Sequence, residues 1–140
     1  MEKRKYITIT ILVIFIFAIG IILFNKINRT SYALNIPAED SVYKIYLEQN
    51  SNKIEIDGQD KINDIVNVIG EVKRTTTDKS VQDSPNVNNQ IKVIFQYNEN
   101  ETTTVFVYKK DDKYIIEQPY NGIYRISPDE YNSVEKYMRD

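Results

Sequence analysis

The residues that most often carry catalysis and metal binding are missing from this chain of 140 residues, which has no Cys, no His and no Trp. Without Cys there is no disulfide, no thiolate nucleophile and no lipidated cysteine. Without His, the usual zinc, haem and general-base sites are excluded. The sequence therefore predicts no metal site and no cofactor.

Two Ser-x-x-Lys motifs remain as candidates for nucleophilic catalysis, one from Ser41 to Lys44 and one from Ser133 to Lys136. A serine activated by a desolvated lysine is a peptide-cleaving arrangement. The companion motifs Ser-Asp-Asn and Lys-Thr-Gly are missing, and the second lysine is expected on the solvated side of a terminal helix. We therefore interpret both motifs as chance occurrences and assign no catalytic residue.

Pairs of carboxylates are a second candidate, because glycoside hydrolysis needs two carboxylates at a suitable separation. The pairs are Asp60 with Asp64, Asp111 with Asp112, and Glu39 with Asp40. They fall on the polar face of a predicted helix, in a turn and in a predicted linker, where a solvated surface is the simpler interpretation. A cell-envelope hydrolase that uses carboxylates or a Ser-Lys pair stays the alternative to a non-catalytic protein.

Tyrosine is the one unusual surplus, with 11 copies. A tyrosine has an apolar body and a polar tip, which suits a binding surface. Several fall in the C-terminal half, at Tyr97, Tyr108, Tyr114, Tyr120 and Tyr124. The same residues equally suit the interior of a sheet that has no Trp to supply bulk.

The element to which everything else is attached is the stretch Tyr6–Phe24, 19 residues without a charge. This is close to the roughly 20 apolar residues that a membrane-spanning helix needs. Thr8 and Thr10 are compatible with it, because a helical threonine bonds back to its own backbone carbonyls. The sequence predicts a transmembrane signal anchor over residues 6–24 and a basic cytoplasmic flank over residues 1–5.

Orientation follows from charge, since Lys3, Arg4 and Lys5 precede the apolar stretch and outnumber the two basic residues that follow it. We expect the N-terminus in the cytoplasm and a domain over residues 42–140 outside the cell membrane, joined by a linker over residues 25–41. A cleaved signal peptide is the alternative, but its apolar core would be unusually long. Residues 1–29 carry a net charge of +4, so the overall −2 leaves the rest at −6, which argues against a nucleic-acid partner.

Alternating apolar residues predict strands over residues 42–47 and 53–57, and Ile62, Ile65, Val66 and Ile69 predict one face of a helix that Gly70 ends in left-handed geometry. A further strand is predicted over residues 72–77, followed by an irregular loop over residues 78–87.

A hairpin and a further strand then form a meander over residues 91–97, 102–110 and 114–116, with the middle strand apolar on both faces and therefore central. Asn121-Gly122 is a type I′ turn signal before a short segment over residues 123–126. Ser127, Pro128 and Glu130 form a capping box for a final helix.

The expected fold class is α+β, a single N-terminal transmembrane helix followed by a small antiparallel-sheet domain of order β-β-α-β-β-β-β-α with two helices on one face.

The segment KYIIEQPYNGIYRI at residues 113–126 and SVQDSP at residues 80–85 resemble a family of membrane-anchored and lipoprotein domains from Gram-positive bacteria, known as domain of unknown function 5301. The resemblance implies an extracytoplasmic domain without an established activity. This chain departs from the lipoprotein members because it has no Cys to lipidate.

Pro119 and Asn121-Gly122 fix a corner at which Glu117, Tyr120, Asn121, Tyr124 and Arg125 are candidate binding residues. A purely structural corner is the competing interpretation, since Gly and Pro mostly punctuate structure. We expect a membrane-tethered, extracytoplasmic and non-catalytic domain that binds a peptide, a protein or an envelope component through this corner or through the sheet face.

Overall fold

The apolar N-terminal stretch is one helix, α1 (Glu2–Ile27), in the computed structural model, which describes residues 2–27, 29–70 and 74–139. The hydroxyls of Thr8 and Thr10 donate to the carbonyls of Arg4 and Tyr6, each at 2.9 Å, as the sequence predicts. The helix is long and apolar enough to cross a membrane. The chain divides into two units, one over Met1–Thr30 and one over Ser31–Asp140.

The second unit begins earlier than residue 42, so the predicted linker over residues 25–41 is wrong for its C-terminal part. Strand β1 (Tyr32–Ala33) pairs with β4 (Thr75–Thr76), and Leu34 and Ile36 pack against the core. Its side chains in fact alternate, with Tyr32, Leu34 and Ile36 partly buried and Ala33 and Asn35 exposed, which is the period of an extended segment that the linker prediction overlooked. Only Thr75–Thr76 of the strand predicted over residues 72–77 is found as a strand, and residues 71–73 lie outside the described residues.

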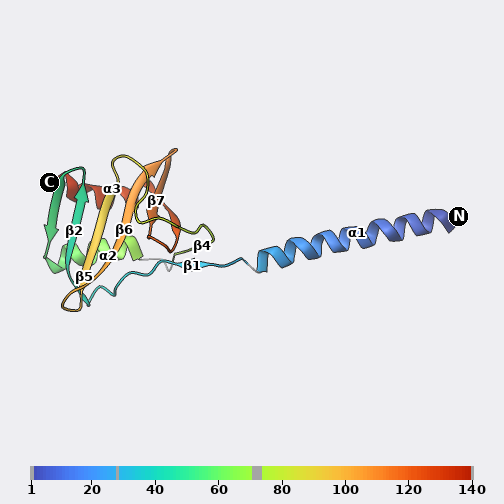
Figure 1. Ribbon diagram of the computed structural model, residues 1–140, viewed down its shortest axis with the longest axis horizontal. Helices are drawn as coiled ribbons and strands as arrows, with labels where there is room; N and C mark the ends of the chain where they lie inside the picture. Colours follow the sequence, from blue (N-terminus) through green and yellow to red (C-terminus); the bar gives the residue numbers. More distant parts are fainter. Residues whose placement is uncertain (1, 28, 71–73, 140) are drawn as a thin grey trace. The chain divides into compact units, whose positions relative to one another are not determined.

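The remaining strands form one antiparallel sheet of six, in the order β3-β2-β5-β6-β7-β8 (Figure 1). Their bounds are Val42–Gln49 (β2), Asn52–Ile56 (β3), Ile91–Tyr97 (β5), Glu101–Lys110 (β6), Lys113–Glu117 (β7) and Ile123–Ile126 (β8). The predicted meander is confirmed, and β6 is an interior strand whose residues 105–108 are buried on both faces. β8 adds a full strand where only a short segment is predicted.

Two helices, α2 (Gln59–Gly70) and α3 (Pro128–Glu135), lie against the strands (Figure 1), and a 3₁₀ turn η1 (Lys136–Met138) follows α3. The predicted apolar face of α2 is buried, and it packs in one core with the row Ile91, Val107, Ile116 and Tyr124, which the strand register places on one side of the sheet. We call this side the helix face. The α+β class with helices on one face is confirmed.

The start of α3 is the predicted capping box. The Ser127 hydroxyl accepts from the Glu130 N–H at 3.2 Å, and the Glu130 carboxylate accepts from the Ser127 N–H at 2.6 Å. These contacts satisfy two backbone donors that a helix N-terminus leaves without partners. Glu130 also forms an ion pair with Arg74, which ties the helix to the segment before β4.

Two glycine predictions are wrong. Gly70 does not have a positive φ, and an added Cβ would lie 2.6 Å from Cδ1 of Ile36, the outer end of that side chain. The Asn121-Gly122 pair is not a type I′ turn, since the positive φ in this turn belongs to Tyr120, at 57°. Two consecutive positive φ values, which such a turn requires, occur at Asn98 (42°) and Glu99 (44°), between β5 and β6, and at Asp111 (48°) and Asp112 (58°), between β6 and β7.

Candidate functional site

The predicted corner between β7 and β8 does not gather its five candidate residues. Register pairs Glu117 with Ile123 and Ile116 with Tyr124, so Glu117 and Tyr124 lie on opposite faces of the sheet. Tyr124 is buried in the core of the helix face. Arg125 is exposed on the same face as Glu117, and Tyr120 projects outward with 61% of its surface exposed.

Asn121 and its neighbour Gln118 attach the corner to the start of the domain. The Asn121 side chain donates to the carbonyl of Ala33 at 2.7 Å, and Gln118 exchanges two hydrogen bonds with the backbone of Asn35, at 2.9 and 2.6 Å. Asn121 also donates to the Tyr124 hydroxyl at 3.1 Å. These contacts are those of a structural corner, the competing interpretation of the sequence.

Glu117 is the exception, because it is a carboxylate with only 1% of its surface exposed. Three neutral donors surround it: the hydroxyls of Ser80 and Tyr108, each at 2.6 Å, and the side-chain amide of Gln82 at 3.1 Å. Burial, and then the hydrogen bond to Glu117, raises the pKa of Tyr108, so the phenol keeps the proton that it donates. A buried carboxylate is stable only with such donors.

Residues 77–90, which we call the cover loop, lie on the face of the sheet opposite the helix face. The hydrogen bonds from Ser80 and Gln82 to Glu117 hold the cover loop there. Ser80 and Pro85 of this loop are buried, and so are Phe106 and Tyr108 of β6 on that face. Towards β2 and β3, in contrast, side chains of the same face are only partly buried or exposed. We call this side of the sheet the loop face, and its uncovered part the open half.

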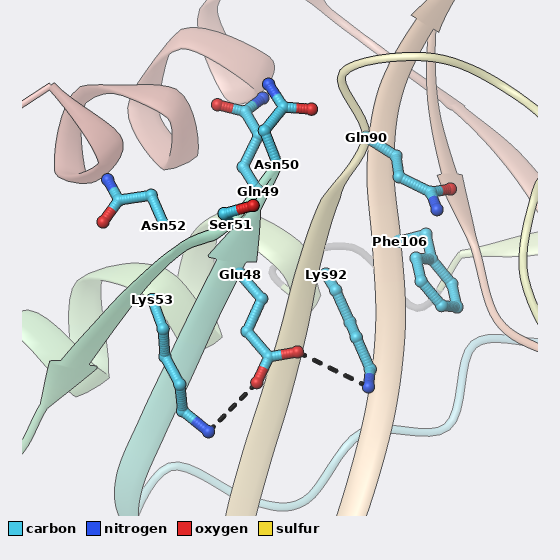
Figure 2. Close-up of a pocket in the computed structure, with 9 residues that line it drawn as sticks. All are labelled: Glu48, Gln49, Asn50, Ser51, Asn52, Lys53, Gln90, Lys92 and Phe106. Atoms are coloured by element: carbon cyan, nitrogen blue, oxygen red, sulfur yellow. Dashed lines mark ion pairs between the residues drawn. The ribbon is translucent and has the colours of Figure 1, made fainter.

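A hollow of about 380 Å³, lined mainly by residues with polar side chains, lies on the open half, between the turn that joins β2 to β3 and the end of the cover loop (Figure 2). It is lined by Glu48, Gln49, Asn50, Ser51, Asn52, Lys53, Gln90, Lys92 and Phe106. Gln49 and Asn50 donate to the backbone and side chain of Asn89, at 2.9 and 3.1 Å, so the two walls are hydrogen-bonded to each other.

Glu48 lies between two lysines at the base of the hollow (Figure 2). Its carboxylate is 3.0 Å from the Lys53 ammonium and 3.6 Å from that of Lys92. The hydrogen bond with Lys53 lowers the pKa of Glu48, and it does so against the opposing effect of burial. The three side chains leave one net positive charge in the hollow of a domain that is acidic as a whole.

Gln90 supplies the atom that most needs a partner. Its Oε1 is buried and accepts no hydrogen bond from any of the residues that the structure describes. Figure 2 shows its amide beside the Phe106 ring, on the opposite side of the hollow from Glu48. A buried carbonyl oxygen without a donor is costly, and a bound N–H or O–H group would remove that cost once the Gln90 side chain turns toward the hollow.

Sequence reasoning missed this hollow. Its signal is the pair of amide-rich runs QNSN at residues 49–52 and NNQ at residues 88–90, which look like ordinary turn residues when each is read alone. Strand pairing of β2 with both β3 and β5 brings the two runs together. The Ser-x-x-Lys residues are engaged elsewhere: Ser41 and Ser133 donate to backbone carbonyls, and Lys44 and Lys136 form ion pairs with Glu55 and Asp64.

Comparison with known proteins gives a family and a fold. The model of the family DUF5301, whose description reads domain of unknown function, matches residues 30–125. An NMR structure of a protein from Ruminococcus gnavus is similar at 31% sequence identity and a TM-score of 0.58, over 70% of this chain and 98% of that one. A comparison with curated proteins finds no match.

The family match starts one residue before the second unit and ends at Arg125, before α3, so it covers the sheet, α2 and the cover loop. The resemblance that the segments at residues 80–85 and 113–126 indicate is confirmed. The chain belongs to the DUF5301 family of domains of unknown function.

Proposed function

We propose that this protein is a membrane-tethered, extracytoplasmic and non-catalytic binding domain that holds a peptide, a protein or an envelope component in the hollow of the open half. The observation that carries the proposal is the buried, unpartnered Oε1 of Gln90. A ligand that offers an N–H or O–H group there would satisfy it, while the surrounding side-chain amides offer both donors and acceptors.

The membrane part of the proposal rests on α1 and on charge. The helix has the length and composition of a membrane span, and three basic residues precede its apolar stretch against two that follow it. Basic residues are retained on the cytoplasmic side, so the N-terminus is inside and the acidic domain is outside the cell membrane.

The hydrolase alternative has less support. Asp64, one of the paired carboxylates, accepts from Lys136 at 2.8 Å and from Tyr137 at 2.7 Å, which is the setting of a surface ion pair. Each serine of the two Ser-x-x-Lys motifs already donates to a carbonyl of its own segment. Neither set faces the hollow.

The test is a titration of the full chain in lipid nanodiscs with soluble glycan strands and glycan–peptide fragments released from bacterial cell walls. The chain has no Cys, so Asn50→Cys at the rim can be labelled at one place with an environment-sensitive fluorophore. Replacement of Gln90 by Leu removes the unpartnered acceptor, and affinity is expected to fall about tenfold.

The matched control is Gln96→Leu, which changes the same residue type on the loop face of β5, the strand that begins directly after Gln90, outside the hollow. It should leave affinity unchanged. Equal losses in both variants, or saturable binding that neither variant weakens, would contradict the assignment of the hollow. Release of shortened fragments during the titration would favour the hydrolase.

A further inference from the structure

Two of the most exposed large apolar side chains of the second unit lie on one corner. Val81 and Tyr120 are 73% and 61% exposed, against 42% for Tyr43, the next in the described part of this unit. Ser80 donates its N–H to the carbonyl of Asn121 at 3.2 Å. Val81 follows Ser80 in the chain and Tyr120 precedes Asn121, so Val81 and Tyr120 lie on adjoining turns. The Tyr120 hydroxyl donates to Asp83 at 2.8 Å.

Tyr120 occupies a backbone position that does not suit it. It follows Pro119 in a turn closed by the Asn121 N–H on the Gln118 carbonyl at 3.0 Å, and its φ is 57°. Glycine or asparagine is the ordinary residue at this third turn position, because a bulky side chain is disfavoured in left-handed geometry. A disfavoured conformation that displays an aromatic ring to solvent points to a use for that ring.

The corner is also close, along the chain, to the end of α1. Asn121 bonds to Ala33 and Gln118 bonds to Asn35, whereas α1 ends at Ile27. Five residues separate Ile27 from Ala33, and the six steps along the chain reach at most roughly 20 Å when fully extended. This connection is short enough for the corner to reach the surface of a membrane that α1 spans.

The charge of the corner does not oppose such a contact. Lys79 and Arg125 are balanced there by Asp78 and Asp83, all four of them exposed, while the rest of the unit is strongly acidic and would be repelled by anionic headgroups. Tyrosine is enriched at the headgroup level of membranes, where its ring is apolar and its hydroxyl stays hydrated.

We propose that Tyr120 and Val81 dock the domain onto the lipid surface of the membrane that α1 spans, with the Tyr120 ring at the level of the headgroups. The proposal rests on the membrane tether of the proposed function and is independent of the ligand in the hollow. The occupant proposed for this surface is lipid, because the corner is bonded to Ala33, a few residues after the helix that forms the membrane tether.

The test uses the full chain in vesicles of phosphatidylcholine and phosphatidylglycerol. The chain has no Trp, so Tyr120→Trp provides the sole indole. Its emission should shift to shorter wavelength on reconstitution, and lipids brominated on the acyl chains should quench it. Ser51→Trp is the control, because Ser51 lies in the turn between β2 and β3, at the opposite edge of the sheet from β7 and β8.

Val81→Trp is the second variant and keeps the test decisive if Tyr120→Trp disturbs the turn. Solvent-like emission from both corner variants, with quenching no greater than that of Ser51→Trp, would overturn the docking proposal. Phe17→Trp within α1 separates the two proposals. Strong quenching of Phe17→Trp without quenching at the corner removes only the docking, whereas no quenching of Phe17→Trp removes the tether and the docking together.

Discussion

The two faces of the sheet are covered in different ways. On the helix face, Phe95, Leu47 and Val93 are fully buried against apolar residues of α2 and α3. On the loop face, an irregular segment is held by hydrogen bonds that converge on one buried carboxylate, Glu117. Within the described part of the domain, the first face has a continuous apolar core, and the second leaves part of its strands uncovered.

The difference shows where this fold can accommodate a binding site. Apolar packing is non-directional and tolerates no gap, so the helix face is closed. Hydrogen bonds to Glu117 fix the cover loop at one place and leave the strands beyond its reach open. The hollow beside Gln90 lies at that limit. We therefore expect stability to depend mainly on the helix face and binding mainly on the loop face.

The largest test of this contrast is Phe95→Ala. Phe95 is fully buried on the helix face, so truncation should lower the free energy of unfolding by about 3–5 kcal/mol. Urea unfolding of the full chain in detergent micelles, followed by circular dichroism, measures this loss. Ile94→Ala, one residue along on the loop face, should cost roughly 1–2 kcal/mol because Ile94 is partly exposed. Equal losses would show that both faces contribute a core.

Glu117→Gln should have the next largest effect, roughly 2 kcal/mol. A neutral amide keeps one accepting oxygen and presents a donor to the hydroxyl of Tyr108 or Ser80, which then loses its acceptor. The decisive measurement is amide hydrogen exchange, in which the N–H of Ser80 should lose protection while the N–H groups of α2 do not. Glu99→Gln, in the exposed turn between β5 and β6, is the control and should change neither quantity. Uniform loss of protection would mean that the cover loop unfolds only together with the core.

A smaller effect is expected at the start of α3. Ser127→Ala removes the cap and should cost about 1 kcal/mol. The matched substitution is Ser133→Ala in the same helix, where the hydroxyl only bonds back to the Asp129 carbonyl at 2.8 Å and should be within roughly 0.5 kcal/mol of neutral. Thermal unfolding of the two variants side by side measures the difference. If Ser127→Ala lowered the free energy of unfolding as much as Phe95→Ala does, polar contacts would stabilise the helix face as strongly as apolar packing.

The smallest effect concerns pH and the ion pair at the edge of the helix face. Hydrogen bonds from Lys136 and then Tyr137 hold the pKa of Asp64 below its ordinary value of 3.8. A lowered folded-state pKa means that the stabilisation is present above pH 3.8 and is lost as pH falls through the folded pKa. Asp64 is 44% exposed, so this amounts to less than about 1 kcal/mol.

Carboxyl-carbon NMR of Asp64 gives its pKa directly, and acid unfolding gives the linked loss of stability. Lys136→Met should raise the pKa of Asp64 and flatten the decline of stability below pH 3.8. An unchanged pKa in this variant would assign the shift to Tyr137 alone, and the ion pair would then contribute nothing to the helix face.

Much of the fold could be predicted because its signals are local. The period of Ile62, Ile65, Val66 and Ile69 reports which side of α2 is buried, and the order Ser127, Pro128, Glu130 contains the whole cap of α3. Turn geometry was predicted less well. The Asn121-Gly122 signal failed because the turn starts earlier, at Gln118. Pro119 occupies its second position, where the ring sets φ, and the left-handed third position then falls on Tyr120.

The candidate site was not predictable in the same way. The sequence offers Glu117 only as one of five candidate binding residues of the corner. Its partners Ser80 and Gln82 are 37 and 35 residues away in sequence, and no local pattern connects them. The five corner residues were expected to converge, yet alternation along β7 and β8 places Glu117 and Tyr124 on opposite faces. The hollow depends on amides from two turns that meet only when the sheet is complete.

The sequence by itself determined the apolar α1, the acidic sheet domain, the order of most strands and the exclusion of thiol and imidazole chemistry, because composition and short-range periodicity are sufficient for each of these. Tertiary structure decided that a carboxylate is buried, that one loop covers half of a sheet face and that an amide oxygen is left without a donor beside the uncovered half. Those features arise from strand register and from the path of the cover loop, which bring together residues that are distant in the chain. Whether each of these residues is buried or exposed to solvent depends on the completed fold.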